Sequence, residues 1–156
     1  MSFRVCPGAV RLGLVAAVIA GPALAEAPEF LKALNNQPLE FTFRPDQEIT
    51  PQVEEFHATG ENPYAGDADA IAAGQASYRK LCAACHLPDG SGRIGPNLIH
   101  GDWKYDRTHT EVGRFEIIYG GGAGSMQAFG QRIDQDEILK IMAFMDSIYI
   151  GDREPE

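Results

Sequence analysis

Two cysteines and a histidine stand close together near the middle of the chain. Residues 82–86 read Cys-Ala-Ala-Cys-His. On a helical turn, Cys82 and Cys85 lie three positions apart and face the same side, so both thiols can bond the vinyl groups of one haem. His86 then lies beside the porphyrin, where its imidazole can bind the iron. The spacing therefore predicts one haem c held covalently by both cysteines, with His86 as the proximal iron ligand.

Two other uses of this pattern, a zinc half-site and a redox-active pair, lack their usual sequence context. A zinc site needs further cysteine or histidine ligands at regular spacing, and the remaining histidines, His57, His100 and His109, are not paired. A thioredoxin-like pair needs strands alternating with helices around it, and the sequence has no such alternation. The sequence context therefore favours haem attachment over both alternatives.

An electron-carrying haem iron needs a sixth ligand that suits both oxidation states, and a methionine sulfur fills that role. Met126 lies in a glycine-rich segment, which is flexible enough to wrap the distal face of a haem. Met142 and Met145 belong to an apolar stripe at helical spacing, where methionine usually fills the core. We therefore predict Met126 as the distal ligand, with His100 or His109 as the alternative.

Helical patterns lie on both sides of the cysteine motif. They predict three helices, over 67–81, 111–119 and 134–150. The last pattern is the clearest, because Asp134 and Glu137 have the spacing of a capping box and an apolar stripe follows them. The sequence therefore predicts an all-α domain.

The chain divides into four expected segments. Residues 1–25 have a basic start, a short apolar run and a small-residue cleavage site, which predict a cleaved signal peptide and a periplasmic protein without stable membrane insertion. Residues 26–66 are proline-rich and predict a mostly irregular N-terminal extension, with one short strand over 39–43. Residues 67–150 are the expected helical domain, and 151–156 are a C-terminal tail.

The acidic residues are concentrated near the N-terminus. The chain has 13 basic and 22 acidic residues, and its formal net charge is −9. Residues 26–70 contain ten of the acidic residues and only two of the basic ones. Such a surface repels nucleic acid and anionic lipid and favours a basic protein partner. The alternative is that the acidity only keeps an exported protein soluble.

Residues around the motif resemble those of class I c-type cytochromes. Gly74 and Tyr78 precede the first cysteine at the spacing at which that family has a glycine and an aromatic residue. Phe144 resembles their aromatic partner in the family's C-terminal helix. The resemblance covers 67–150 and implies the class I fold, in which three to four helices surround one covalently bound haem.

Two loops extend the resemblance to the haem ligands. Pro96, in the segment Gly-Pro-Asn-Leu, matches the family's proline loop, whose carbonyl orients the ligand histidine. Met126 begins a segment that is similar to the distal methionine loop, with Gln127 where proline is common. Two further residues are candidates for the haem environment. Trp103 can reach a propionate with its N–H or simply pack in the core, and Arg93 can pair with a propionate or remain solvated.

A narrower resemblance is to cytochrome c-L and its relatives, carried by segments 62–64, 103–105 and 115–126. It implies an electron-transfer protein and not an enzyme. Its expected donor is a quinoprotein methanol dehydrogenase that depends on pyrroloquinoline quinone, and its acceptor a downstream cytochrome c or oxidase. Two alternatives stay open at this point, a shuttle for another respiratory complex and a haem enzyme or sensor with an open distal site. A structural calcium ion also stays open.

Overall fold

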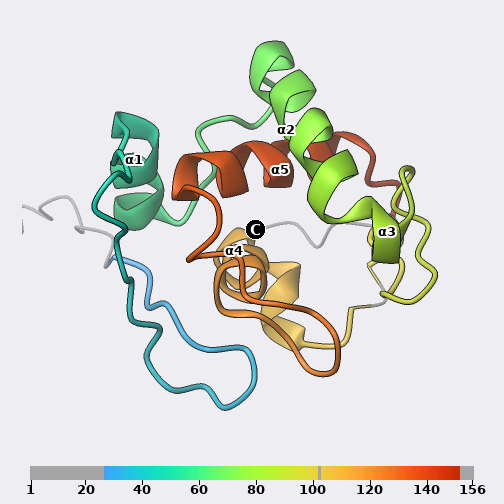
Figure 1. Ribbon diagram of the computed structural model, residues 1–156, viewed down its shortest axis with the longest axis horizontal. Helices are drawn as coiled ribbons and strands as arrows, with labels where there is room; N and C mark the ends of the chain where they lie inside the picture. Colours follow the sequence, from blue (N-terminus) through green and yellow to red (C-terminus); the bar gives the residue numbers. More distant parts are fainter. Residues whose placement is uncertain (1–26, 102, 152–156) are drawn as a thin grey trace, which may run out of the picture.

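The computed structural model describes residues 27–101 and 103–151. The expected signal peptide and most of the expected C-terminal tail lie outside these residues. The described part is helical, without a sheet, which confirms the predicted all-α class. Its elements are α1 (Pro51–Thr59), α2 (Ala68–Leu81), α3 (Ala83–His86), the 3₁₀ helix η1 (Asp106–His109), α4 (Glu111–Gly120) and α5 (Gln135–Ser147) (Figure 1). Within the described ranges, no helix has the length and apolar character that crossing a bilayer requires.

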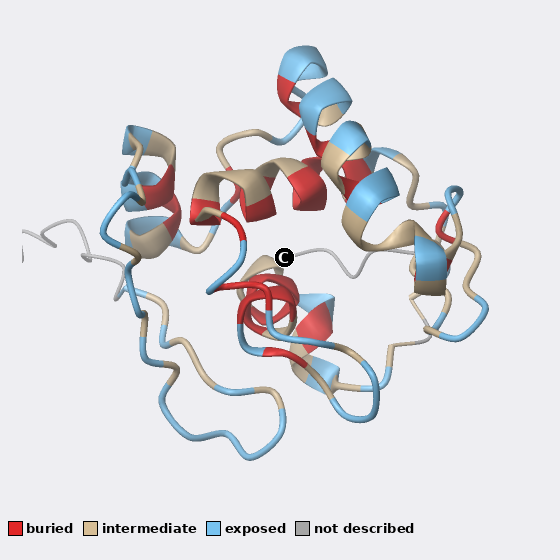
Figure 2. Ribbon diagram, in the orientation of Figure 1, coloured by how far each residue is buried: buried red, intermediate tan, exposed pale blue. Residues whose placement is uncertain are grey.

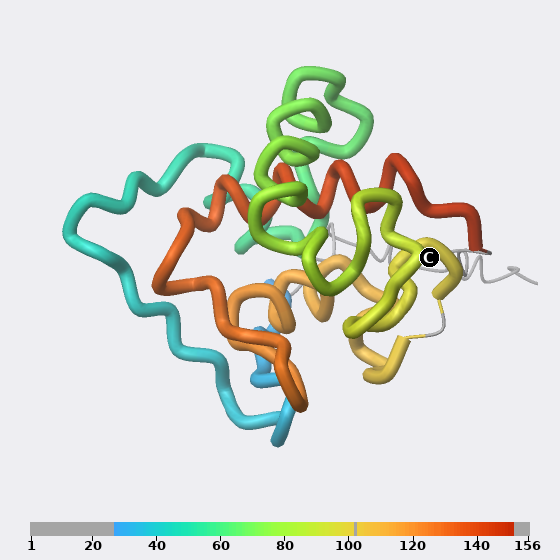
Figure 3. Tube along the Cα trace, turned by 45° about the vertical axis from the view of Figure 1, so that its right-hand side comes forward, coloured from blue at the N-terminus to red at the C-terminus, as the bar shows by residue number. Residues whose placement is uncertain are grey.

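The crossing of α2 and α5 is the most extensive contact between helices in the described part of the chain (Figures 1 and 3). Gly74 makes this approach possible, because a Cβ atom there would lie 1.8 Å from the carbonyl oxygen of Lys140. One turn further along α2, the ring of Tyr78 lies 5.1 Å from that of Phe144, measured between centroids. The structure therefore has the glycine and aromatic packing that the class I resemblance implies.

The two long helices begin in different ways. The carboxylate of Asp67 accepts a hydrogen bond of 2.8 Å from the amide of Ala70, so Asp67 is the N-cap of α2. Asp134 precedes α5, but its side chain makes no capping bond. It pairs instead with Arg44 of the N-terminal extension. The predicted capping box is therefore wrong, because a tertiary ion pair takes the carboxylate. The helix also ends at Ser147, earlier than predicted.

The N-terminal extension contains a helix that the sequence pattern did not predict. The hydroxyl of Thr50 accepts a hydrogen bond of 3.3 Å from the amide of Val53, and Pro51 occupies the first turn of α1. Gly60 ends the helix with a φ of +79°. Only Val53 and Phe56 are buried in these nine residues, which is too few to produce a sustained helical period.

The strand predicted over 39–43 is not formed. The nearby pairing is a single bridge between Leu31 and Pro38. Burial alternates only over 39–42, where Phe41 packs with its ring centroid 5.2 Å from that of Tyr119, and the pattern stops at Phe43, which is 53% exposed. The segment lies along the helical domain without a partner strand.

A buried carboxylate ties the extension to the helical domain. Glu116 of α4 is fully buried and accepts a hydrogen bond of 2.8 Å from Nε of Arg107 and a second bond from the same guanidinium. It also accepts a bond of 2.6 Å from the amide of Leu31. Figure 2 shows the buried residues gathered on α4 and α5, while most of the extension is exposed or half-buried. The core is therefore centred on these two helices, and Val53 and Phe56 of α1 in the extension are also buried in it.

Candidate functional site

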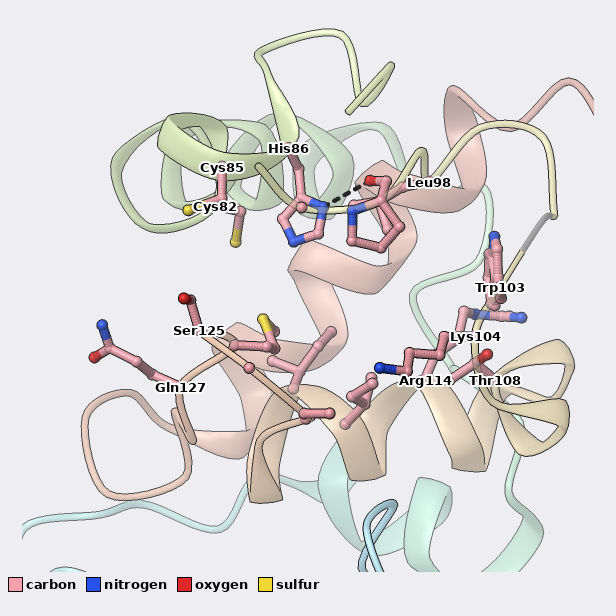
Figure 4. Close-up of a pocket in the computed structure, with 18 of the residues that line it drawn as sticks. Cys82, Cys85, His86, Leu98, Trp103, Lys104, Thr108, Arg114, Ser125 and Gln127 are labelled. Carbon is pink, nitrogen blue, oxygen red and sulfur yellow. Dashed lines mark hydrogen bonds between the residues drawn. The ribbon is translucent and has the colours of Figure 1, made fainter. Parts of the chain in front are cut away.

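A cavity of about 510 Å³ lies between the cysteine segment and α4 with its following loop. Its volume is within the range of small-molecule and cofactor sites, about 300–1,000 Å³. Figure 4 shows Cys82, Cys85 and His86 on one side of it, with Thr108 and Arg114 on the other. Apolar side chains cover much of the remaining wall, among them Leu81, Leu98, Ile117, Ile118 and Phe129.

The cysteines are presented on the turn that joins α2 to α3. The carbonyl of Cys82 accepts hydrogen bonds from the amides of Cys85, at 3.1 Å, and His86, at 3.0 Å, so this segment is helical and both thiols line the cavity. Neither cysteine forms a disulfide in this structure. Burial, with a further contribution from Cys85, raises the pKa of the Cys82 thiol to about 12. A redox-active pair has a lowered thiol pKa, so this environment disfavours the thioredoxin-like alternative.

His86 is fixed for binding through one particular nitrogen. Its Nδ1 lies 2.9 Å from the carbonyl oxygen of Pro96. Because a carbonyl only accepts, Nδ1 carries the proton and Nε2 keeps a free lone pair. The ring points into the cavity (Figure 4). Gly95 lies flat against it, since a Cβ atom at this position would lie 2.5 Å from Cε1 of His86. Pro96 thus supplies the hydrogen-bond acceptor for the imidazole, and Gly95 leaves the space that the ring needs.

The chain reverses direction directly after His86. Leu87 has a φ of +64°, a left-handed conformation that costs a bulky residue about 1–3 kcal/mol. The hydroxyl of Tyr78 donates to the carbonyl of Leu87 at 3.0 Å, and the amide of Gly92 donates to that of His86 at 2.9 Å. These bonds hold the turn, so that the following loop folds back over the imidazole.

The loop after α4 brings Met126 to the cavity. Met126 is half-buried and belongs to the lining. Met145 of α5 also reaches the lining. By contrast, Met142 is fully buried in the core and is not part of the cavity wall, and neither His100 nor His109 lines it. Of the candidates for the sixth ligand, the structure therefore brings Met126 to the cavity and leaves both histidines away from it.

One end of the cavity carries unsatisfied N–H groups. The indole Nε1 of Trp103 is buried and has no hydrogen-bond partner among residues 27–101 and 103–151. The guanidinium of Arg114 lies 5.4 Å from the centroid of the same indole, and its buried Nε also has no partner in that part of the chain. An unpaired buried N–H group is costly unless a ligand accepts from it. This end of the cavity therefore suits a ligand with carboxylate groups, as the propionates of haem are.

Arg114, and not the expected Arg93, is the arginine that lines the cavity. Arg93 is exposed, lies outside the lining, and donates at 3.0 Å to the carbonyl of Ala84. Arg114, which the sequence did not single out, is 8% exposed and lines the cavity. The available signal was an arginine within residues 112–119, which are otherwise uncharged apart from Glu116. Together, the paired thiols, the oriented imidazole, the thioether and this polar end fit a covalently bound haem.

Comparisons with known proteins agree with this geometry. The family model described as "Cytochrome C oxidase, cbb3-type, subunit III" matches residues 69–145. A cbb3-type cytochrome c oxidase subunit CcoP from Rubrivivax gelatinosus is 31% identical over 97 residues, which are 62% of this chain and 31% of that protein. The family model thus lies within the helical domain, and the match to the oxidase subunit covers less than two thirds of the chain.

Cytochrome c-L proteins are similar over nearly the whole chain. Cytochrome c-L of Methylorubrum extorquens is 32% identical over 162 residues, covering 99% of this chain and 82% of that protein. The crystal structure of cytochrome cL from Methylophaga aminisulfidivorans superposes with a TM-score of 0.77 at 35% identity, covering 80% of this chain and 83% of that one. The structure from Hyphomicrobium denitrificans gives a TM-score of 0.76 at 31% identity, covering 81% and 76%. The chain therefore belongs to the cytochrome c-L family, a family of class I c-type electron-transfer cytochromes.

Proposed function

We propose that this cytochrome is a periplasmic single-electron carrier that accepts electrons from a methanol dehydrogenase containing pyrroloquinoline quinone. A downstream cytochrome c or oxidase is the proposed acceptor. The observation that carries the proposal is the convergence of four groups on one cavity: the thiols of Cys82 and Cys85, the oriented ring of His86 and the thioether of Met126. These groups are what one covalently attached, six-coordinate haem requires.

Each of these residues has a proposed role. Cys82 and Cys85 form thioether bonds to the vinyl groups, and His86 binds the iron through Nε2. Met126 supplies the sulfur ligand on the opposite face, which favours a higher reduction potential than two nitrogen ligands. The Pro96 carbonyl, 2.9 Å from Nδ1, keeps the imidazole in the binding tautomer. When bound, the haem supplies one-electron exchange between Fe(II) and Fe(III).

The polar end of the cavity is proposed to hold the propionates. Trp103 has a buried N–H without a partner among the described residues, and so has Nε of Arg114 beside it, although the same guanidinium pairs with Asp146 at 3.4 Å. Arg93 lies outside the cavity and donates to a backbone carbonyl. We therefore assign the arginine role in the haem environment to Arg114 in place of Arg93.

The surface around the cavity supports electron exchange with a protein partner. Ile94, which belongs to the lining, is 68% exposed, and Ser125 and Gln127 of the facing loop are exposed as well. A bound haem would thus have an edge near the surface between these two loops. Outer-sphere transfer through such an edge needs neither a nucleophile nor an acid–base pair. Partner recognition depends on the surface instead.

The choice of partner rests on similarity along the whole chain. Cytochrome c-L of Methylorubrum extorquens aligns with 99% of the chain, whereas the oxidase subunit of Rubrivivax gelatinosus aligns with 62% of it. The proposed boundaries are a signal peptide over 1–25, the extension over 26–66 and the cytochrome domain over 67–150. Export to the periplasm follows from the first of these segments. Similarity to the oxidase subunits supports a second candidate, a shuttle that serves another respiratory complex.

A reduction assay tests the proposed partner. Oxidised holoprotein is mixed with purified methanol dehydrogenase and methanol, and haem reduction is followed by stopped-flow absorbance. We expect rapid reduction at low ionic strength and slower reduction as salt is added. At 0.1 M salt, charges on the two proteins that are more than about 10 Å apart are largely screened from each other, which weakens electrostatic steering. Reduction by ascorbate is the control that shows a functional haem. A protein that ascorbate reduces, but that the dehydrogenase does not reduce at low salt, has a different donor.

A further inference from the structure

The loop that carries Met126 contains few restraints of its own. Gly121 and Gly124 have φ values of +83° and +74°, and the chain turns at residues 124–125. Across this turn, the amide of Gly122 donates to the carbonyl of Met126 at 3.1 Å. Glycine adopts many conformations at little cost, so this sequence does not select one arrangement by itself. The position of the thioether therefore depends on what holds the loop from outside.

One hydroxyl reaches this loop from the neighbouring wall of the cavity. The amide of Ala123 donates a hydrogen bond of 2.7 Å to the hydroxyl oxygen of Tyr105. Among the described residues, no other hydrogen bond joins the backbone of residues 122–126 to a residue outside the loop. Tyr105 and Met126 both line the cavity. In the part of the chain that the structure describes, a single hydrogen bond thus joins the backbone of the methionine loop to this neighbouring wall.

Tyr105 is itself attached to a rigid part of the fold. Its carbonyl accepts hydrogen bonds from the amide of Thr108, at 3.0 Å, and from the hydroxyl of that buried residue. The next residues form η1, which packs closely on α4, since a Cβ atom at Gly113 would lie 1.8 Å from the carbonyl oxygen of Arg107. The backbone of Tyr105 is therefore held in place by hydrogen bonds, and its side-chain hydroxyl binds the glycine-rich loop.

We propose that Tyr105 is a positioning residue for the distal ligand, and that its hydroxyl keeps the loop in the arrangement that presents Met126 to the iron. This inference rests on the proposed haem function and adds a residue to it. Loss of one ordinary hydrogen bond shifts an equilibrium by about fivefold. Without the hydroxyl, the dissociated form of Met126 should therefore be about fivefold more populated.

Tyr105→Phe removes this hydroxyl and keeps the ring. In the reduced holoprotein, carbon monoxide binds only when the sixth position is open, so its apparent association rate follows the population of the dissociated form. We expect about fivefold faster binding in Tyr105→Phe and a weaker methionine–iron absorption band in its oxidised form. Tyr64→Phe is the matched control, because it also loses one tyrosine hydroxyl bond, to Asp136 at 2.6 Å, but lies outside the cavity lining. It should bind carbon monoxide at the wild-type rate.

Amide exchange in the unmodified holoprotein gives a test that needs no variant. The Ala123 amide should exchange more slowly than that of Ser125, for which the structure has no backbone hydrogen bond. Equal exchange at the two amides would overturn the proposal, as would wild-type carbon monoxide binding in Tyr105→Phe.

A third variant distinguishes a failure of the role of Tyr105 from a failure of the assignment of Met126. Met126→Ala should open the sixth position fully and bind carbon monoxide rapidly. If it does so while Tyr105→Phe behaves as wild type, only the role of Tyr105 fails. If Met126→Ala binds no faster than wild type, the assignment of Met126 fails, and the role of Tyr105 fails with it.

Discussion

Replacing Gly74 by alanine tests whether the close crossing of α2 and α5 holds the domain together. The added Cβ would lie 1.8 Å from the carbonyl oxygen of Lys140, 2.4 Å from its carbon and 2.9 Å from the amide nitrogen of Ile141. All three atoms belong to the backbone and cannot rotate away. Ordinary contact begins at 3.4 Å, so the two helices would have to separate by about 1.6 Å.

Two opposing contributions determine the size of the effect. Alanine favours a helix interior by about 1 kcal/mol over glycine. Overpacking typically costs about 1–3 kcal/mol, and we expect the upper end because backbone atoms form the obstacle. The net loss in the free energy of unfolding should therefore be about 2 kcal/mol. For a chain of 156 residues, this loss corresponds to a fall in Tm of roughly 4–8 °C. Tyr78 on α2 and Met145 on α5 both line the cavity, so their separation should also alter the haem absorption spectrum.

Denaturant titration of the oxidised holoprotein, followed by far-ultraviolet circular dichroism, measures this loss. Gly120→Ala is the matched control, because it adds the same methyl group within a helix. Its nearest neighbour is Cδ1 of Leu39 at 3.1 Å, the end of a flexible side chain. The control should stay within about 0.5 kcal/mol of the wild type. A Gly74→Ala protein as stable as the wild type, or more stable, would refute the reasoning, because helix propensity alone predicts that outcome.

Three further predictions concern the extension and the cavity. Glu116→Gln should lower the denaturant midpoint by an amount equivalent to about 2 kcal/mol, since it leaves Arg107 without its buried anion; an unchanged midpoint would contradict the anchoring role. Burial lowers the pKa of His57 from 6.5 despite its bond to Gln135, so its contribution to stability is complete above pH 6.5 and is lost as the pH falls below it. Thermal unfolding between about pH 8 and pH 5 should show this slope in the wild type and a smaller one in His57→Phe; equal slopes would exclude His57 as the cause. Trp103→Phe should destabilise the holoprotein by about 1–2 kcal/mol in denaturant titration if its N–H meets a propionate, and no loss would argue for simple packing.

Local signals in the sequence were sufficient for the central helices and for the cysteine motif. The capping aspartate at Asp67 and the run of helix formers after it act within a few residues, and the structure starts α2 there. Cys82, Cys85 and His86 are likewise brought together by a single helical turn. Met126 needed more, but a glycine-rich loop with one methionine left few alternatives. The predictable part of the site is therefore the part set by neighbours in the sequence.

Features that depend on distant segments were missed or misassigned. Asp134 has the spacing of a capping residue, yet Arg44, ninety positions earlier, takes its carboxylate. The alternation over 39–43 predicted a strand, but no other segment of the described chain pairs with it as a strand, and Phe41 packs against the ring of Tyr119 instead. Helix α1 has few buried residues of its own, so its apolar pattern was weak even though Thr50 and Pro51 supplied starting signals.

The cavity wall shows the same difference between near and distant neighbours. Arg114 and Arg93 are both arginines near the motif in space, and only the fold decides which of them faces the cavity. Tyr105 gains its importance from a contact with Ala123, eighteen positions later. Neither relation leaves a period or a spacing in the sequence. They follow from the packing of η1 on α4, which places one wall of the cavity opposite the methionine loop.

Mass spectrometry of protein purified from its native compartment tests the central claim most directly. We expect the intact mass to exceed that of the polypeptide by one haem, and the added mass to map to the peptide that contains Cys82 and Cys85. Both thiols should resist alkylation after denaturation, because thioether bonds survive unfolding. A colourless protein of unmodified mass, in which both thiols react, would contradict the assignment of this cavity to a covalently bound haem.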